Sequence, residues 1–283
     1  MDRSSEDSLT RLFSVKRIGN NAEMRDGRVL DIVAVEEPLD IRIAFSVKQA
    51  RLSQNLALTM RTPGADRELA AGFLLSEGVV RVREDIVEIR ELGIAPSNEI
   101  VVELAEHVDF DGWRLNRNTV LNSSCGICGK RSIESLTRAS PIRAVDKLRL
   151  DPETIRCLPD LLREWQEGFS RTGGLHAAAL VAPSGNIVRV FEDIGRHNAL
   201  DKLLGWAFLD GMVPLIDHLL FMSSRSSFEL VAKAAAAGSP VLATVGGPSS
   251  LAIETARALG VTLLGFVRDN RFNVYSGEWP INS

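Results

Sequence analysis

Residues 219–266 have the sequence LLFMSSRSSFELVAKAAAAGSPVLATVGGPSSLAIETARALGVTLLGF, in which short apolar runs alternate with longer segments of helical periodicity. Apolar runs of this length predict buried strands, and a glycine after each helical segment marks where the helix ends. Such alternation is typical of βαβ units on a parallel sheet, so we expect an α/β fold here. The expected strands are Leu219–Met222, Val241–Val245 and Val261–Phe266, and the expected helices are Ser226–Ala237, with a Ser226…Glu229 capping box, and Ser250–Leu259.

The residues just before this region add two strands and two helices. Pro183–Asn186 is a turn signal between the apolar runs Ala177–Val181 and Ile187–Phe191. One helix is expected through Leu200–Ala207, and an earlier helix ends at Gly173–Gly174. The earlier helix has an apolar stripe formed by Leu161, Leu162, Trp165 and Phe169.

The first hundred residues favour strands, because their apolar runs are rich in β-branched residues or alternate with polar ones. One helix interrupts them, with Asp66 as its expected N-cap and Gly78 just past its end. The expected strands are Val29–Val35, Leu39–Val47, Asn55–Met60 and Glu99–Leu104.

The strand-rich composition ends near residues 110–130, where Asn, Ser and Gly cluster. We therefore expect two domains and an α+β organisation overall. Residues 1–124 form the strand-rich N-terminal domain, whose first ~10 residues are charged and expected to be disordered. Residues 125–283 form the α/β domain.

Composition excludes several classes of protein. The chain has 283 residues, 45% of them apolar, and a net charge of −4, which is ordinary for a globular protein and argues against a surface that coats nucleic acid. The N-terminus has no apolar core like that of a signal peptide, and no apolar run approaches the roughly 20 residues that span a bilayer. Three cysteines cannot form a disulfide framework, so we expect a cytoplasmic location.

Three loops that follow the expected parallel strands carry groups that bind anions. Ligands of open α/β sheets bind at the carboxyl ends of the strands. Ser223–Ser227 and Gly246–Ser250 lead into helix N-termini, where free N–H groups and the helix dipole favour phosphate, and Arg268–Arg271 adds two guanidinium groups. Helix capping and surface ion pairs explain each loop alone, but the three together favour a phosphorylated ligand. GxGxxG and GxxxxGK[ST] are both absent, so a standard dinucleotide or triphosphate site is not indicated.

The segment Glu192–Asn198 lies at an expected strand-to-helix turn and concentrates charged groups. In the simpler interpretation Asp193 caps the helix, and Arg196 and His197 lie on its first turn. Cations there oppose the helix dipole, however, which favours a ligand or an acidic neighbour. His176, at the start of an expected strand, is as readily a hydrogen-bonded structural residue as a functional one.

Cys125-Gly126-Ile127-Cys128-Gly129, followed by two cations, concentrates two of the three thiols in one segment. Glycine allows unusual backbone angles, and nearby positive charge lowers the pKa of a thiol. Four interpretations compete: a zinc site, a thioredoxin-like redox motif, a carrier of sulfane sulfur, and two incidental loop cysteines. The weak strand pattern before Cys125 counts against the redox motif.

Zinc is not expected. A closed structural site needs four ligands, and no second Cys pair follows CxxC. Zinc deaminases use H-x-E followed downstream by P-C-x-x-C, but His176-Ala177-Ala178 has alanine in place of the glutamate and no cysteine follows Cys157. No metal ligands are therefore predicted.

The segments that carry a family resemblance are, in chain order, Met60–Gly64, Glu68–Gly78, Cys125–Gly129, Thr172–Ala178, Glu192–Lys202, Phe266–Arg268 and Phe272–Ser276. Together they resemble the FdhD family, the sulfurtransferase accessory proteins of formate dehydrogenase. CxxC alone is a weak signal, whereas EDIGRHNALDK at Glu192–Lys202 in this order is highly specific. The family usually has Ser-Gly-Arg-x-Ser where this chain has Ser223–Ser227, so the backbone of that loop is in doubt.

The resemblance implies a sulfurtransferase. Family members take sulfur from a cysteine desulfurase as a cysteine persulfide and pass it to the molybdenum bis(molybdopterin guanine dinucleotide) cofactor of formate dehydrogenase. By this resemblance Cys125 carries the persulfide, and Cys128 assists or protects it. The alternative is a non-catalytic chaperone that holds the cofactor or the dehydrogenase without moving sulfur.

The resemblance also implies a C-terminal domain with the three-layer α/β fold of cytidine deaminase but without its zinc, and a homodimer. The expected partners are a cysteine desulfurase and a molybdenum-dependent formate dehydrogenase, with neither nucleic acid nor a membrane. The cofactor is expected as a bound substrate that GDP mimics. The expected cofactor-binding residues are Phe266, Val267, Arg268, Asp269, Asn270, Arg271, Arg225, Ser226, Gly246, Gly247 and His197.

Overall fold

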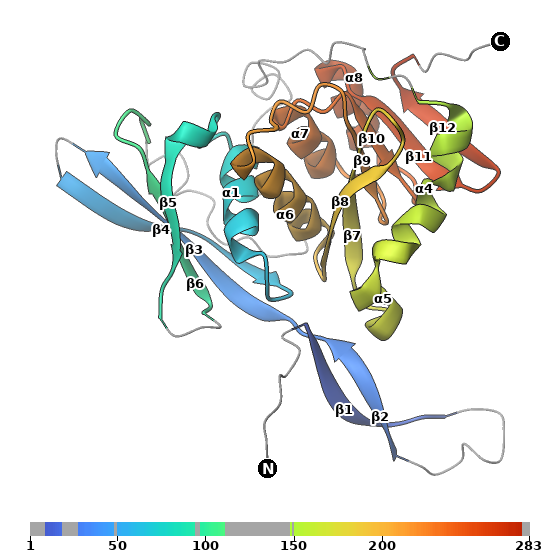
Figure 1. Cartoon of the computed structure of the whole chain (residues 1–283), viewed down its shortest axis with the longest axis horizontal. Coiled ribbons are helices and arrows are strands. Elements are labelled where there is room, and N and C mark those ends of the chain that lie inside the picture. Colours follow the sequence, from blue (N-terminus) through green and yellow to red (C-terminus); the bar gives the residue numbers. More distant parts are fainter. Residues whose placement is uncertain are drawn as a thin grey trace.

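The strands of the chain form a six-stranded sheet, a four-stranded sheet and a separate hairpin (Figure 1). The computed structural model describes residues 9–18, 28–47, 50–93, 97–110, 148 and 150–278. The expected domain boundary and the first eight residues therefore lie outside the described residues.

The six-stranded sheet belongs to the C-terminal half and has the order β12-β11-β10-β9-β7-β8. Its central strands β9, β10 and β11 are parallel, as the strand–helix alternation predicts, while β12, β7 and β8 are antiparallel to their neighbours. The strands are β7 (His176–Val181), β8 (Ile187–Asp193), β9 (Leu219–Met222), β10 (Val241–Thr244), β11 (Thr262–Arg268) and β12 (Arg271–Ser276).

Helices cover both faces of this sheet. Side chains of alternate strand residues point to opposite faces. On one face, Ala178 and Leu180 share a core with α6 (Arg196–Leu209), α7 (Phe228–Ala236) and α8 (Ser250–Leu259). On the other face, Ala177 and Ala179 pack with α4 (Pro152–Trp165), which α5 (Glu167–Thr172) follows. The predicted three-layer α/β arrangement is confirmed.

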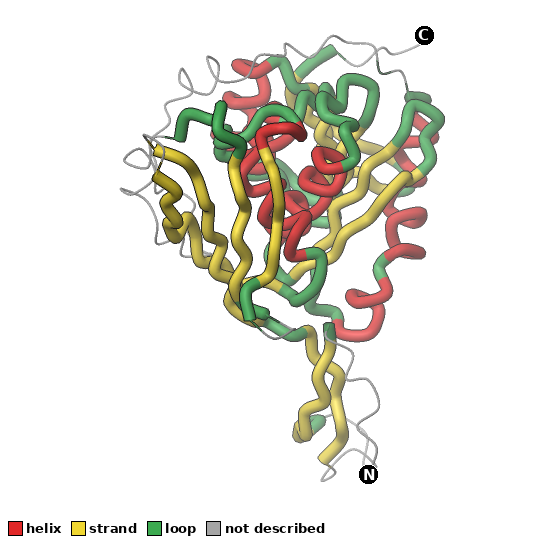
Figure 2. The backbone as a smooth tube through the Cα atoms, turned by 60° about the vertical axis from the view of Figure 1, so that its left-hand side comes forward, coloured by secondary structure: helices red, strands yellow, loops and turns green. Residues whose placement is uncertain are grey.

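The four-stranded sheet of the N-terminal half has the order β4-β3-β6-β5 and packs against the helix α1 (Asp66–Ser76). Figure 1 shows α1 between this sheet and α6. One continuous cluster of buried residues joins the sheet, α1 and the α6–α8 layer. The strands are β3 (Glu37–Val47), β4 (Ala50–Arg61), β5 (Ile86–Glu91) and β6 (Glu99–Leu104). The hairpin of β1 (Thr10–Lys16) and β2 (Arg28–Ala34) projects beyond the body (Figures 1 and 2).

The helices α1 and α6 touch through two glycines. A Cβ atom at Gly72 would lie 1.9 Å from the carbonyl oxygen of Asp201, and one at Gly205 would lie 1.8 Å from the carbonyl oxygen of Glu68. Both obstacles are backbone atoms of the facing helix. Only glycine therefore permits this close approach of the two helices.

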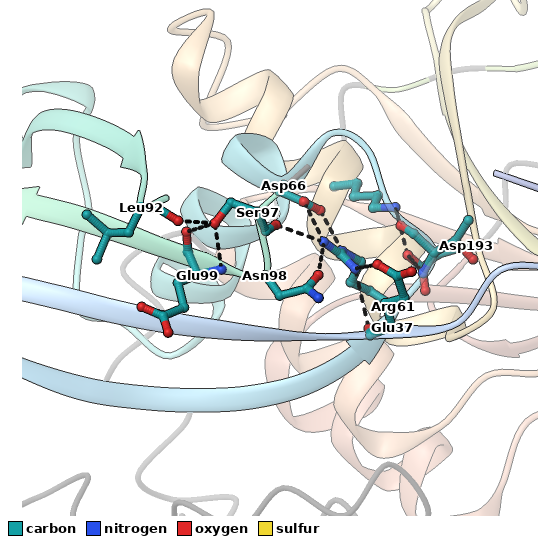
Figure 3. A network of polar contacts seen from close by, with 10 residues as sticks. Glu37, Arg61, Asp66, Leu92, Ser97, Asn98, Glu99 and Asp193 are labelled. Carbon is teal, nitrogen blue, oxygen red and sulfur yellow. Dashed lines mark hydrogen bonds and ion pairs between the residues drawn. The ribbon is translucent and has the colours of Figure 1, made fainter. Parts of the chain in front are cut away.

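Two buried ion pairs, one in each half, lie near the ends of β4 and β8, and hydrogen bonds of Thr62 with Lys202 and Asp193 connect the halves (Figure 3). The guanidinium of Arg61, which is fully buried, donates to both carboxylate oxygens of Asp66 at 2.9 Å. Beside it, Lys202 pairs with the buried Asp193 at 2.7 Å and donates to the carbonyl of Thr62 at 2.8 Å. Each buried charge thus has an oppositely charged partner, and the backbone of Thr62 adds hydrogen bonds to the pair of the other half, as buried ions require.

Three local expectations are wrong. Asp66 does not cap α1, because Ala65 is the N-cap and the Asp66 carboxylate is held by Arg61. The Ser226…Glu229 capping box is absent, because Ser227 is the N-cap of α7 and the Ser226 hydroxyl bonds Thr244. In the stripe expected at residues 161–169, Leu161 and Trp165 are exposed; α4 ends at Trp165, and its buried residues are Ile155, Leu158 and Leu162. Tertiary partners overrode local signals in the first two cases.

Strands β1, β5 and β12 were not predicted. Among the described strands β1 pairs with β2 alone, and its side chains Leu12 and Phe13 are exposed, so it has no clear inside–outside alternation. β5 contains the charged sequence IVEIRE, of which only Ile86 and Ile89 are buried. Edge strands with so few buried residues give a weak periodic signal.

Candidate functional site

The three loops after β9, β10 and β11 lie side by side at the carboxyl ends of the parallel strands. The amide of Gly246 donates to the carbonyl of Ser224 at 3.0 Å, and the amide of Phe266 donates to the carbonyl of Gly246 at 3.2 Å. Ser226 and Pro248 form an isolated parallel bridge. The structure thus joins three loops, spread over residues 223–271, into one surface, as expected for this edge of an open sheet.

The antiparallel strands β7 and β8 bring two further segments to the same edge. His176 at the start of β7 faces Asp193 at the end of β8 in the strand register, and α6 begins three residues later. The amide of Ser223 donates to the carbonyl of Ala177 at 3.0 Å. His176 and the start of α6 are therefore neighbours of the loop 223–227.

Within that loop the side chains of Ser223 and Ser226 form hydrogen bonds within the protein, whereas the side chain of Arg225 is exposed. Ser226 is almost fully buried, and its hydroxyl shares a 2.9 Å hydrogen bond with Thr244. The Ser223 hydroxyl accepts from the amide of Ala177 at 2.9 Å. Arg225 is exposed. Ser226, predicted to bind the cofactor, therefore has its side chain committed to the sheet, and Arg225 is the free charge of the loop.

The serine at the position of the family's usual glycine is accommodated without strain. Among the described non-glycine residues, positive φ angles occur only at Ala65 and Phe266, so Ser224 has ordinary backbone angles. Its side chain is buried and donates to the carbonyl of Arg225 at 3.3 Å. The substitution leaves the loop in an unstrained conformation.

Gly246 and Gly247 allow close approach of the next loops. A Cβ at Gly247 would lie 2.6 Å from the Phe266 ring, and one at Gly246 would lie 3.1 Å from the Cα of Arg225. Phe266 itself has φ 52°, in the left-handed region that is unfavourable for a bulky residue. Strain of this kind persists where the surroundings impose it and concentrates at functional sites.

The β11–β12 turn places cations beside that ring. The Arg268 guanidinium lies 5.8 Å from the centre of the Phe266 ring. Arg268 faces Arg271 in the hairpin register, Asp269 and Asn270 form the turn, and all four residues are exposed. Val267, by contrast, is fully buried in the core under α4, so only its backbone can face a ligand.

Arg196 and His197, the two residues expected to oppose the helix dipole, lie in the first turn of α6. His197 contacts Glu229 of α7 at 2.7 Å, so the acidic neighbour that its position favoured is present. Hydrogen bonding to His197 lowers the pKa of Glu229 despite partial burial. Sequence reasoning thus allowed for the acid but did not identify it, because Glu229 lies 32 residues away on another helix.

Arg196, in the first turn of α6, belongs to the site although it was not predicted to bind the cofactor. Its Nε atom is buried and has no hydrogen-bond partner among the described residues. Burial, and then the charge of Arg225, lower the pKa of the Arg196 guanidinium. Two arginines close enough to repel each other, with one nitrogen unsatisfied, form a place where an anion would be stabilised. The cation density of residues 192–198 was the only sequence signal for it.

Other residues of the same segment are structural. The Asp193 carboxylate accepts from Lys202 at 2.7 Å, from the amide of Gly195 at 2.8 Å and from the amide of Thr62 at 3.2 Å. It is fully buried, as is most of Asn198, which donates to the carbonyl of Met60 at 2.7 Å. These side chains face the N-terminal half rather than the sheet edge.

His176 is half-buried beside this cluster. Burial, followed by the charges of Arg196 and His197, lowers the pKa of its imidazole, so the ring is neutral near pH 7. A neutral imidazole can donate through one nitrogen and accept through the other. The histidine therefore offers hydrogen bonds rather than charge.

The sulfur-bearing segment cannot be placed relative to these loops. Cys125 and Cys128 lie outside the described residues. Cys157, on α4, is exposed and free. Within the described ranges, no group of three or more His, Cys, Asp or Glu side chains is arranged to hold a metal ion. No helix there has the length and apolar character to cross a membrane.

Comparisons with known proteins agree over nearly the whole chain. The model of the FdhD/NarQ family matches residues 34–282. The sulfur carrier protein FdhD of Streptomyces avermitilis is 45% identical over 269 residues, which cover 91% of this chain and 93% of that protein. The proteins of the same name from Mycobacterium tuberculosis and Saccharolobus solfataricus are 44% and 38% identical and cover 87% and 93% of this chain, and 90% and 95% of their own lengths.

A solved structure shares the fold. The crystal structure of a Desulfotalea psychrophila protein assigned as a formate dehydrogenase accessory protein superposes with a TM-score of 0.72. It covers 95% of this chain and 97% of its own, at 22% sequence identity.

Proposed function

The chain belongs to the FdhD/NarQ family, and we propose that it is a sulfur carrier that supplies sulfur to the molybdenum cofactor of a formate dehydrogenase. The observation that carries sulfur transport is the identity of 38–45% with proteins named sulfur carrier protein FdhD over most of both chains. The CxxC segment at Cys125 supports it, because no other segment of the sequence pairs two thiols.

Cys125 is the proposed carrier. Its thiolate attacks the terminal sulfur of a persulfide on a cysteine desulfurase; the new S–S bond forms as the desulfurase thiolate leaves. For release, the Cys128 thiolate attacks the Cys125 sulfur. A Cys125–Cys128 disulfide forms, and the terminal sulfur departs as hydrosulfide with the electron pair of the old S–S bond. Two cellular thiols then reduce the disulfide through a mixed disulfide, leave as a disulfide of their own, and restore both cysteines for the next cycle.

The sheet edge is the proposed site of the molybdenum bis(molybdopterin guanine dinucleotide) substrate. Arg225, Arg268 and Arg271 are exposed cations on adjoining loops, and the backbone of Gly246 joins these loops through hydrogen bonds to Ser224 and Phe266. Guanidinium groups bind phosphate oxygens strongly and often through two parallel hydrogen bonds. These residues would hold the pyrophosphates of the cofactor, and Arg196 would add a further cation.

Mass spectrometry tests the carrier. The protein is incubated with a cysteine desulfurase and cysteine and then weighed intact. We expect one added sulfur atom in the parent and in Cys157→Ala, whose exposed thiol is the matched control, and none in Cys125→Ala. Equal loading of Cys125→Ala would refute the assignment. If both CxxC variants, each changed to alanine, still restored formate dehydrogenase activity in cells lacking this protein, a chaperone that moves no sulfur would be the better description.

Calorimetry with GDP tests the site. Arg268→Ala and Arg271→Ala are each expected to weaken binding about tenfold, because a charge-assisted hydrogen bond is lost. Arg90→Ala removes the same charge from exposed β5 of the other sheet and should bind GDP like the parent. Unchanged affinity in the first two variants would remove the β11–β12 turn from the site.

The proposal also includes a cytoplasmic homodimer. Family resemblance supports it, together with the small number of cysteines in the sequence. Light scattering on the full chain measures the oligomeric state directly. A monomer over the concentrations used in the sulfur-transfer assay would contradict the dimer without affecting the carrier assignment.

A further inference from the structure

The β1–β2 hairpin exposes apolar side chains along both of its strands. It projects beyond the body of the molecule, as Figures 1 and 2 show. On β1 the side chains of Leu12 and Phe13 are 60% and 50% exposed, and on β2 those of Leu30 and Val33 are 68% and 39% exposed. A two-stranded hairpin on its own is marginally stable at best in water, and contiguous exposed apolar surface marks interaction sites. The hairpin therefore has the properties of a surface that another protein covers.

The base of the hairpin is attached to the body, which sets the direction in which it projects. The guanidinium of Arg171, on α5, donates to the hydroxyl of Thr10 at 3.1 Å. A Cβ atom at Gly174 would lie 3.7 Å from the Cβ of Ala34, at the end of β2. The ends of both strands thus contact the segment that follows α4, and the apolar residues farther along the hairpin are presented to another molecule.

One face of the hairpin has an uncharged and largely apolar centre. Residues that pair across two antiparallel strands lie on the same face, as do residues two apart in one strand. Leu12 pairs with Ile32, and Ser14 pairs with Leu30, so these four side chains share a face. We call them the hairpin patch. Leu12 and Leu30, the most exposed apolar residues of the two strands, both belong to it.

The two ends of the hairpin have opposite charge. At the end away from the body, Arg28 is exposed and pairs in the strand register with Lys16, a second cation. A carboxylate beside Arg28 would be favourable, because like charges directly opposite each other are destabilising. At the base, Glu36 is exposed, and its neighbour Glu37 lies 3.7 Å from the guanidinium of Arg11. The hairpin is thus basic at one end and has an exposed acid at the other.

We propose that the hairpin patch binds the hairpin patch of a second copy of the chain, with the two hairpins antiparallel. The inference rests on the homodimer of the proposed function and locates its interface. A two-fold axis builds an interface from the same surface on both subunits. Arg28 and Glu36 are each four residues from Ile32, so an axis at the Leu12–Ile32 pair sets Arg28 of each copy beside Glu36 of the other. The charges of the hairpin therefore complement those of a second hairpin that runs in the opposite direction.

Loss of the apolar contact is tested by light scattering on the full chain over a range of concentrations. The double variant Leu12→Thr/Leu30→Thr should raise the dimer dissociation constant at least about tenfold, because it removes apolar surface that the dimer buries. Threonine retains the preference for strands, so the hairpin itself should persist. The matched control is Val87→Thr, which changes a 60% exposed side chain of β5 in the four-stranded sheet and should dimerise like the parent.

Charge reversal tests the antiparallel arrangement. Arg28→Glu and Glu36→Arg should each raise the dissociation constant about threefold to tenfold, because two symmetry-related attractive contacts become repulsive. The double variant Arg28→Glu/Glu36→Arg restores opposite charges at both contacts and should dimerise close to the level of the parent. Such restoration would also show that neither substitution acts by unfolding the chain.

The outcomes separate failure of this interface from failure of the proposed function. If the parent is a dimer and the threonine variant or the single reversals dimerise equally well, the interface lies elsewhere and the homodimer remains. A double reversal that stays as weak as the single ones would overturn the antiparallel arrangement. A monomeric parent would overturn both the homodimer and the hairpin interface, whereas sulfur loading at Cys125 would still decide the carrier assignment by itself.

Discussion

The α1–α6 interface and the loop-bearing edge of the six-stranded sheet share one segment, residues 192–202, yet they treat polar groups in opposite ways. At the interface every charge of this segment is paired: Asp193 with Lys202, and Asp201 with Lys233 at 2.8 Å. At the edge, Arg196 has an unsatisfied buried nitrogen, and Arg225 is exposed beside it. Within this one segment, some charged residues therefore stabilise the fold and others are available to bind a ligand.

This difference gives a criterion for assigning roles within a dense sequence motif. Charges whose partners come from the protein contribute to stability, and their loss should be measured in unfolding. Charged groups without such partners should affect binding and leave stability nearly unchanged. The expected effects below test both sides, beginning with the largest.

Lys202→Met should cause the largest loss of stability. Lys202 and Asp193 are both buried, and the substitution leaves the Asp193 carboxylate in the interior without its cation. Breaking a buried pair in this way costs about 3–5 kcal/mol. Denaturant unfolding measures it. The matched control is Arg156→Met, which breaks the solvent-exposed pair with Glu153 and should change stability by less than about 1 kcal/mol. Equal effects of the two substitutions would mean that burial does not distinguish them.

Gly205→Ala should follow, at about 1–3 kcal/mol or more. The new methyl group would lie 1.8 Å from a backbone carbonyl of α1, which cannot move without separating the helices. The melting temperature should fall by several degrees, since about 1 kcal/mol corresponds to roughly 2–4 °C in a chain of this size. GDP affinity, measured below the transition, should stay close to that of the parent. A variant as stable as the parent would show that α1 and α6 can shift apart at little cost.

The contrast between these regions explains what the sequence could and could not predict. The α/β alternation of residues 219–266 contains its own periodic signal, so β9, β10, α8 and the three-layer arrangement follow from it. The carboxyl ends of parallel strands meet at one edge, which made the neighbourhood of the three loops predictable as well. These features depend on local pattern and on a general rule of topology.

Pairing across long sequence separations was not predictable in the same way. Asp66 and Ser226 have the chemistry of helix caps, but Arg61 and Thr244 bind their side chains in the folded chain. Arg196 stands out by the hydrogen-bond partner that its Nε atom lacks among the described residues, which no single-sequence pattern can reveal. A local preference, such as that of Asp or Ser for helix capping, does not determine the structure where a residue distant in sequence forms a stronger contact with the same side chain.

Gly247→Ala adds the same methyl group as Gly205→Ala, but at the loop-bearing edge of the sheet instead of the α1–α6 interface. Here the added methyl group meets the Phe266 ring at 2.6 Å, and a side chain can move where a backbone cannot. Stability should fall by less than about 1 kcal/mol, whereas a displaced ring would disturb Arg268 above it and weaken GDP binding about tenfold. Calorimetry and unfolding on the two glycine variants should therefore give opposite outcomes. A Gly247→Ala protein that is strongly destabilised but binds GDP normally would reverse the assignment of the two regions.

The smallest expected effect is the pH dependence contributed by His176. Its folded-state pKa lies below the ordinary histidine value of 6.5, so between the two values the unfolded chain binds a proton that the folded chain does not. The stability that this histidine contributes is therefore complete above about pH 7.5 and is lost as the pH falls through 6.5 toward the lower folded-state pKa. Solvent screens a half-exposed ring, so the loss should stay below about 1 kcal/mol. His176→Gln removes the titrating group, and comparing its unfolding with that of the parent at about pH 7.5 and pH 5.5 cancels the contribution of the carboxylates. Parallel curves for the two proteins would show that the His176 imidazole has the same pKa in the folded and unfolded chains, and its partial burial at this edge would then have no energetic consequence.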